Sequence, residues 1–207
     1  MTVILNAVSL TLVLLPEVIA WGSLGHITTA YLAGQFVSNS TEAYYKDLLK
    51  NGGNDYLSSV SLWAESFKHT ESGRFTETFY FIDAHDNPPM SCNSLDHALS
   101  KSRRADAARF IIHFLGDLHQ PLHNEDVGRG ATRIPVKWEG TPLDVHHVWD
   151  SSIAEKLIGG LHGKPAPLAH MWANQLAVEI THGKFKAEKA AWLMDFNITK
   201  PNATAMS

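Results

Sequence analysis

Apolar residues recur along most of this chain at the three-to-four-residue spacing of an α-helix that buries one face. The spacing repeats over the segment that follows Trp21 and over 39–49, 57–67, 103–120, 167–182 and 186–196. Asn39, with Glu42 three residues later, is typical of a helix start. The pattern therefore predicts a mainly α-helical chain.

Two segments depart from the helical spacing. Residues 75–82 and 132–138 are rich in β-branched and aromatic side chains, which favour extended backbone. We therefore expect a short β-hairpin or extended segments beside the helices. The chain has 207 residues, of which 44% are hydrophobic and 18% charged, and it contains no internal repeat. These values fit a single domain of ordinary size with a real core.

The first twenty residues have the composition of a secretory signal. Residues 8–15 are almost wholly apolar, Pro16 follows, and Val18-Ile19-Ala20 ends in the small residue that signal peptidase prefers. The apolar run is too short to cross a bilayer. We therefore predict a signal peptide over 1–20 and a secreted domain over 21–207, with no membrane attachment after cleavage.

Composition adds two constraints. Three sequons for N-glycosylation agree with secretion, at Asn39, Asn197 and Asn202. The formal net charge is −4, whereas an ordinary nucleic-acid-binding domain is basic. A bound metal would make the charge positive locally. The single cysteine, Cys92, has no partner within the chain.

Two histidine–aspartate pairs carry the candidate chemistry. His113 and Asp117, and likewise His146 and Asp150, lie four residues apart, so each pair shares one face of a helix. One such pair is more often a solvated surface pair than a site. Two pairs, with His123 nearby and twelve histidines in the chain, favour a metal centre. Imidazole and carboxylate are ligands that zinc uses, and catalytic zinc sites keep a coordination position open.

The predicted new N-terminus extends this hypothesis. Cleavage after Ala20 would leave Trp21 with a free α-amine, which can close a five-membered chelate on a metal together with the carbonyl of the same residue. His26, one helical turn further on, could join that chelate. Alternatively, Trp21 and His26 simply begin a buried helix.

These motifs resemble the secreted, zinc-dependent, single-strand-specific nucleases of fungi and plants, the type I nuclease or 3′-nucleotidase family. The motifs that carry the resemblance are Trp21-Gly-x-x-Gly-His26, Phe81-Ile-Asp-Ala-x-Asp-Asn-Pro-Pro89, Gly116-Asp-x-x-Gln-Pro-Leu-His123, and His146-x-x-Trp-Asp150 followed by Lys156-Leu-Ile-Gly-Gly160. The similarity runs from Trp21 to about Ala205. Together these motifs are highly specific.

The resemblance implies a fold and an activity. The family has a single all-helical domain related to the zinc phospholipases C, with three zinc ions in one cleft. Its members hydrolyse single-stranded DNA and RNA to 5′-phosphate products and remove 3′-phosphates from nucleotides. We therefore expect a secreted monomer that holds two or three zinc ions.

The resemblance also assigns roles to particular residues. The metal ligands that it implies are Trp21, His26, Glu65, His113, Asp117, His123, His146 and Asp150. Asp117 would bridge the zinc of the terminal chelate to a second zinc. Glu65, Lys68 and Asp117 would act in catalysis, with Lys68 steadying the reacting phosphate. Phe81 would stack on a base while Asp83 binds the edge of that base, and stacking suits single strands of any sequence.

The chain departs from the family at several points. Glu65 replaces a metal-binding aspartate, and Tyr80 replaces a histidine of the same zinc site. A phenol is a poor zinc ligand, because it loses its proton only near pH 10. The loop after Cys92 is shorter than in the family, and helices beyond Pro201 are missing. The alternative is therefore a secreted zinc- or nucleic-acid-binding remnant without turnover. A zinc phospholipase fits less well, because Phe81 and Asp83 suit a base rather than a lipid.

Overall fold

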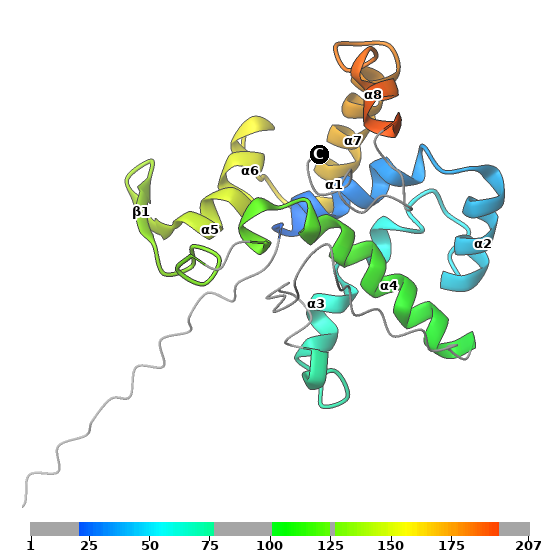
Figure 1. The fold of residues 1–207 in the computed structure, drawn as a ribbon, viewed down its shortest axis with the longest axis horizontal. Coiled ribbons are helices and arrows are strands. Elements are labelled where there is room, and N and C mark those ends of the chain that lie inside the picture. The colour runs from blue at the N-terminus through cyan, green and yellow to red at the C-terminus, as the bar shows by residue number, and fades with distance from the viewer. Residues whose placement is uncertain (1–20, 77–100, 125–126, 195–207) are drawn as a thin grey trace, which may run out of the picture.

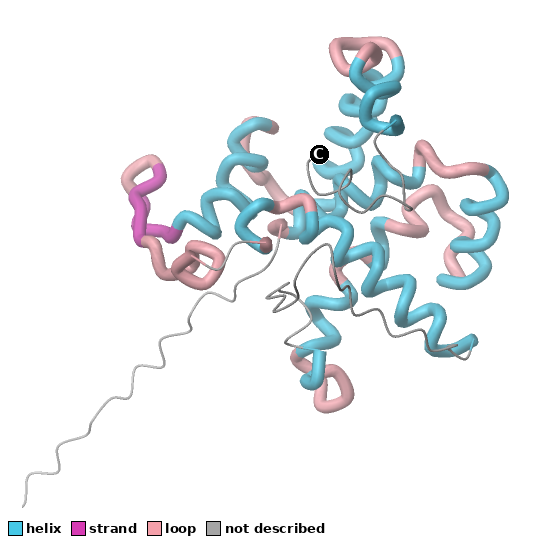
Figure 2. The backbone as a smooth tube through the Cα atoms, in the orientation of Figure 1, coloured by secondary structure: helices cyan, strands magenta, loops and turns pink. Residues whose placement is uncertain are grey.

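The computed structural model describes residues 21–76, 101–124 and 127–194, and in these ranges it is mainly helical, as the sequence predicts. Figure 2 shows the helices in cyan and one small pair of strands in magenta. The elements are α1 (Ser23–Gly34), α2 (Asn39–Leu49), the short 3-10 helix η1 (Ser58–Val60), α3 (Trp63–Lys68), α4 (Lys101–Leu118), the 3-10 turn η3 (Pro121–His123), β1 (Pro135–Trp138), β2 (Thr141–Asp144), α5 (Val145–His147), the π-helical turn η4 (Val148–Ser152), α6 (Ile153–Leu157), α7 (Pro165–Thr181) and α8 (Glu188–Met194).

Helix α1 lies at the centre of the molecule, where it packs along α7 and also contacts α4 (Figure 1). One side of α1 belongs to an apolar cluster whose buried members are Leu24, Ile27, Ala154 and Ala169. The hydroxyl of Thr28 donates a hydrogen bond to the carbonyl of Ala169 at 3.5 Å. The small side chain of Ala169 lets the two helices approach closely.

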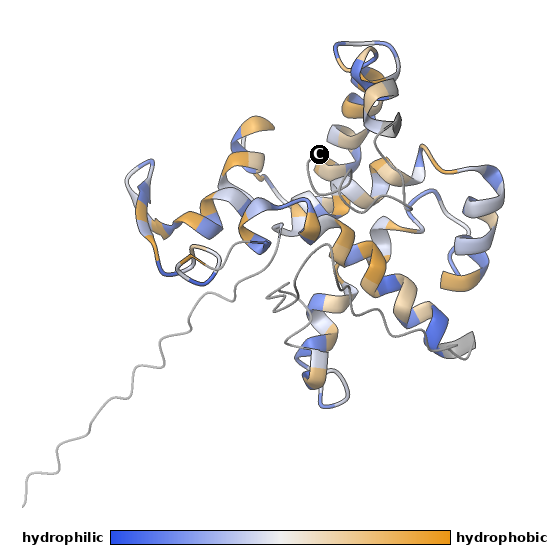
Figure 3. Ribbon diagram, viewed as in Figure 1, coloured by the Kyte–Doolittle hydropathy of each residue, from blue (hydrophilic) through white to orange (hydrophobic). Residues whose placement is uncertain are grey.

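A second apolar cluster joins α1 to α2 and α4. Its buried members are Ala30, Leu49, Tyr56, Leu57 and Ala108. Figure 3 shows the apolar residues of α4 in orange along much of the helix. Because α1 contributes to both clusters, it fixes the position of α4 relative to α7, and α4 carries two of the predicted metal ligands.

The two strands form an antiparallel hairpin, which confirms the predicted short hairpin beside the helices, and β1 lies within the segment 132–138 that was expected to be extended. Val136 pairs with Leu143, and Trp138 pairs with Thr141. Glu139 and Gly140 form the two-residue turn, with φ of 48° and 87°. Both values are positive, as a type I′ turn requires. The hairpin leads directly into α5, which carries the histidine of the second histidine–aspartate pair.

Helix α2 begins at Asn39, as predicted, and its cap is Ser38, whose hydroxyl accepts the Thr41 N–H at 3.2 Å. Two other local predictions need correction. The predicted helix over 57–67 is divided into η1 and α3. In this serine-rich stretch, the hydroxyls of Ser58 and Ser61 donate to carbonyls three residues earlier, which competes with regular helix. Residues 75 and 76 lie in a helical turn rather than a strand.

Several predictions fall outside the described residues: the signal peptide, Tyr80, Phe81, Asp83, Cys92, Asn197 and Asn202. Over the ranges that the structure does describe, none of the helices combines the length and the apolar character needed to cross a bilayer.

Candidate metal centre

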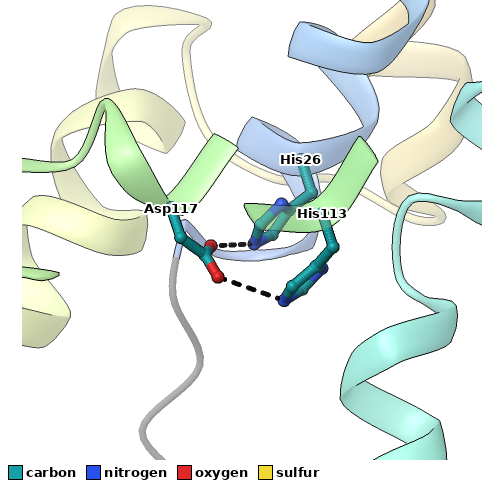
Figure 4. Close-up of side chains that lie close together, drawn as sticks. All are labelled: His26, His113 and Asp117. Atoms are coloured by element: carbon teal, nitrogen blue, oxygen red, sulfur yellow. Dashed lines mark ion pairs between the residues drawn. The ribbon is translucent and has the colours of Figure 1, made fainter. Parts of the chain in front are cut away.

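The first group of candidate ligands brings two helices together. His113 and Asp117 lie one turn apart on α4, and His26 comes from α1 (Figure 4). The Nε2 of His26 lies 3.2 Å from Oδ1 of Asp117, and the Nε2 of His113 lies 3.5 Å from Oδ2. All three residues are buried. Asp117 therefore faces both imidazoles, with a different carboxylate oxygen toward each.

The close approach of the helices at this point depends on Gly116. The rings of His26 and His113 are stacked, with centroids 4.0 Å apart and an interplanar angle of 10°. A Cβ atom on Gly116 would lie 2.9 Å from the Nδ1 of His26. A larger residue at 116 would thus push into the ring of His26.

The second group joins three short elements. His123 ends η3, His146 lies on α5, and Asp150 lies on η4, and all three are buried. The Nε2 of His146 is 3.0 Å from Oδ2 of Asp150, and the rings of His123 and His146 have centroids 4.9 Å apart. Each of the two groups gathers its three ligand atoms within 4.8 Å of one another, the spacing of a metal site.

Backbone carbonyls fix the histidine tautomers. The Nδ1 of His113 donates to the carbonyl of Ser61 at 2.7 Å, and the Nδ1 of His146 donates to the carbonyl of Gly130 at 2.5 Å. In the neutral rings this leaves the lone pair on Nε2, which faces a carboxylate oxygen in both cases. The Nε2 lone pair and the carboxylate oxygen are both acceptors, so at 3.0–3.5 Å they need a proton or a metal ion between them. Metal-binding histidines are commonly oriented by such a hydrogen bond from the other nitrogen.

Burial also sets the charges of the first group. Burial raises the pKa of Asp117 to about 6, with smaller contributions from Glu65 and Asp150 in the same direction and opposing ones from His113 and His123. These interactions join the two groups in one electrostatic site. A buried carboxylate next to other acids is stabilised by a cation, so the charge of the site fits a metal.

Burial and neighbouring charges shift the pKa values of the three histidines in different directions. Burial lowers the pKa of His26 to about 4, although Asp150 partly opposes this shift. Burial, with a further contribution from His26, lowers the pKa of His113 to about 4. Burial disfavours the charged form of His146 too, but its contact with Asp150, its hydrogen bond to the Gly130 carbonyl and the charge of Asp144 together outweigh burial, so its pKa is raised. Above about pH 5, His26 and His113 are therefore neutral, the form that binds metal.

Glu65 lies beside the first group rather than within it. Its side chain is buried on α3, and its Oε1 is 2.5 Å from the Nζ of Lys68 and 3.7 Å from the Nε2 of His69. Glu65 raises the pKa of Asp117, and Lys68 lowers that of His113. The predicted ligand and the predicted phosphate-binding lysine thus form an ion pair at the edge of the site.

Comparison with known proteins places the chain. Residues 21–207 match the model of the family described as S1/P1 Nuclease. This chain belongs to the S1/P1 nuclease family. It is 34% identical to Nuclease S1 of Aspergillus oryzae, over 95% of this chain and 75% of that protein. It is also 34% identical to Nuclease P1 of Penicillium citrinum, over 89% and 76%, and 29% identical to Endonuclease 4 of Arabidopsis thaliana, over 72% and 60%.

The family match begins at Trp21, the predicted first residue of the secreted domain. The Trp21 side chain lies over Gly25, where an added Cβ would be 2.9 Å from the Trp21 Cβ. The N–H of Gly22 donates to the carbonyl of Asp150 at 2.8 Å. Residue 21 therefore lies just before α1 and beside the element that carries Asp150. The terminal chelate itself remains a prediction.

Four features that support the site could not be predicted from the sequence: the carbonyls of Ser61 and Gly130, and the side-chain roles of Gly116 and Gln120. A backbone carbonyl leaves no trace in a sequence. Gly116 and Gln120 were visible within the motif that ends at His123, but their roles depend on contacts with α1 and η4. Phe81 and Asp83, the predicted base-binding residues, lie outside the described residues.

Proposed function

We propose that this chain is a secreted, zinc-dependent phosphodiesterase that hydrolyses single-stranded DNA and RNA to 5′-phosphate products and removes 3′-phosphates from nucleotides. Membership in the S1/P1 nuclease family supports a nuclease. The observation that carries the proposal is the convergence of two buried His–His–Asp groups from separate elements.

The residues of both groups fit zinc. Each group offers two imidazole nitrogens and a carboxylate oxygen, a common zinc ligand set. Among the residues that the structure describes, neither ring nitrogen of His26 makes a hydrogen bond, although the side chain is 1% exposed. Buried polar atoms are nearly always bonded, so these nitrogens are suited to a ligand. When bound, zinc would lower the pKa of a water and offset phosphate charge.

The chain's own residues would hold this chemistry in place. Asp117 and Asp150 supply negative charge on two sides of one site, and carbonyl hydrogen bonds keep His113 and His146 in the binding tautomer. Lys68 would place its ammonium against the nonbridging oxygens of the phosphodiester. The resemblance assigns base stacking to Phe81, which would favour unpaired bases over duplex.

One observation favours the alternative, a secreted zinc- or nucleic-acid-binding protein without turnover. Glu65 and Lys68 are paired with each other at 2.5 Å, and neither is part of the His–His–Asp groups. If that pair persisted with metal and substrate bound, Lys68 would not reach the phosphate. Binding would then survive while hydrolysis failed.

We further propose that the secreted protein is a glycosylated monomer. Asn39, the sequon residue within the described ranges, is exposed at the start of α2, where a glycan can be accommodated. Glycosylation at Asn197 and Asn202 rests on the sequence alone.

Hydrolysis of a labelled single-stranded oligonucleotide by the chain that begins at Trp21 tests the proposal. We expect cleavage to 5′-phosphate products, slower cleavage of the matching duplex, loss of activity with a chelator and recovery with zinc. A chain with one extra residue before Trp21 should lose most of this activity, because the α-amine becomes a peptide nitrogen. Binding of the oligonucleotide without any cleavage at saturating zinc would instead establish the alternative.

A further inference from the structure

We propose that Gln120 is a positioning residue that fixes both His123 and Asp150 in the second metal-binding group. This role rests on the proposed function, because it assumes that the group binds a metal. Gln120 follows the end of α4 and precedes η3, and its side chain is fully buried, with 0% exposure.

Both the oxygen and the NH2 group of the Gln120 amide make hydrogen bonds. The Oε1 accepts the backbone N–H of Leu122 at 2.5 Å. Because only the oxygen end can accept from an N–H, the NH2 end must face the other way. There it donates a short hydrogen bond to Oδ1 of Asp150. The orientation of the amide is therefore fixed by the backbone.

The first of these bonds shapes the turn that carries His123. Gln120 is the cap residue of η3, and its backbone carbonyl also accepts the N–H of His123 at 3.0 Å. Pro121 follows at the first position of the turn and has no N–H to satisfy. The side chain of Gln120 thus ties down the three-residue segment that ends in a ligand.

The second bond holds the carboxylate of Asp150. With Oδ1 engaged by Gln120, Oδ2 points to the Nε2 of His146 at 3.0 Å. Asp150 lies in a π-helical turn, which is an uncommon local geometry. A carboxylate free to rotate would lose entropy on binding metal, whereas Gln120 holds it in advance.

Zinc binding to a set of chains that begin at Trp21 tests the role. The chains are the unchanged protein, Gln120→Glu, Asp150→Ala and the double variant, each titrated with zinc against a chromogenic chelator. Gln120→Glu keeps an oxygen for Leu122 but places a carboxylate against Asp150. We expect it to weaken one zinc by ~10- to 100-fold and to leave the others unchanged. Gln35→Glu is the matched control, because Gln35 donates to Asn174 in an exposed bond at 3.0 Å.

The double variant separates positioning from general structure. If Gln120 acts through Asp150, adding Gln120→Glu to Asp150→Ala should weaken zinc no further. Gln120→Met, which removes the hydrogen bonds without adding charge, should weaken the same zinc if Gln120→Glu folds poorly. The role is overturned if Asp150→Ala loses one zinc while both Gln120 variants keep it, or if the two losses simply add. If Asp150→Ala keeps every zinc, the metal centre itself is wrong, and the role of Gln120 falls with it.

Discussion

Oδ1 of Asp117 on α4 lies 3.2 Å from the Nε2 of His26 on α1, which joins two helices far apart in the sequence through one carboxylate. The other oxygen of Asp117 faces His113 at 3.5 Å. Asp117 is the carboxylate of the first group of candidate ligands. The first group of ligands therefore depends on Asp117 for both its charge and its connection between helices.

Asp117→Asn should abolish hydrolysis by orders of magnitude and release zinc, because the amide keeps the size of the side chain but not its charge. Zinc content after dialysis and the rate of single-strand cleavage measure the two effects. Asp144→Asn is the matched control, since asparagine can also accept the hydrogen bond that Asp144 accepts from the His147 N–H at 2.8 Å. Equal zinc loss in the two variants would refute the role of Asp117.

Gly116→Ala should lower zinc content through a steric effect on His26. The added Cβ would lie 2.9 Å from Nδ1 and 3.3 Å from Cε1 of that ring. Alanine favours helix by ~1 kcal/mol over glycine, but overpacking of a buried site costs ~1–3 kcal/mol, so the net effect should be destabilising. Gly52→Ala is the control, because nothing lies within 4 Å of its Cβ. Full zinc content in Gly116→Ala would show that the ring can move aside.

The metal-free protein should lose stability as the pH falls from about 6.5 to about 4. The folded pKa values of His26 and His113 are lowered from 6.5 to about 4, so their contribution is complete above pH 6.5 and is lost as the pH falls through this window. Asp117 acts in the opposite direction. Its folded pKa is raised from 3.8 to about 6, so its contribution is present below pH 3.8 and is lost as the pH rises through 6.

Between pH 4 and 6 the unfolded chain binds more protons than the folded chain at His26 and His113, and fewer at Asp117. Because two histidines oppose one aspartate, the unfolded chain binds about one proton more in total. The free energy of unfolding should therefore rise with pH in this window. Urea unfolding in the presence of a chelator, at several pH values, measures the slope. A free energy of unfolding that increases toward pH 4 would mean that the histidines are not buried as neutral rings.

Reversion of the two altered ligand positions should restore the zinc site that they share. Glu65→Asp shortens the side chain that is paired with Lys68 at 2.5 Å, and Tyr80→His returns an imidazole. We expect zinc content and cleavage rate to rise together, and the double variant to exceed the combined effects of the singles, because both ligands serve one metal. Catalysis by the unchanged chain should also increase with added zinc.

An inactive, poorly folded double variant would contradict the view that these two ligand positions limit activity. In that case the folding of the chain, rather than these ligands, would limit activity. Circular dichroism and thermal unfolding of the double variant distinguish the two explanations.

Sequence spacing was sufficient to predict the pairs within each helical turn, since residues four apart share a face wherever a helix forms. His113 with Asp117 and His146 with Asp150 are such pairs, and the structure brings each together. The meeting of His26 with Asp117 could not follow from spacing, because it depends on how α1 packs on α4. The resemblance to a family, rather than the pattern, supplied that pairing.

The supporting atoms were harder to predict. The carbonyls of Ser61 and Gly130 act through the backbone, so any residue could supply them. The start of α2 at Asn39 was predictable, but the sequence alone does not say which of Ser38 and Asn39 caps the helix, because both are good cap residues.

The number of zinc ions held by the chain that begins at Trp21 tests the central claim most directly. Elemental analysis after dialysis should find two or three zinc ions per chain, with fewer in His26→Ala and in His146→Ala, each of which removes a ligand from a different group. A protein that retains no zinc, or one whose zinc content is the same in both variants as in the unchanged chain, would contradict the account of these two groups as a metal centre.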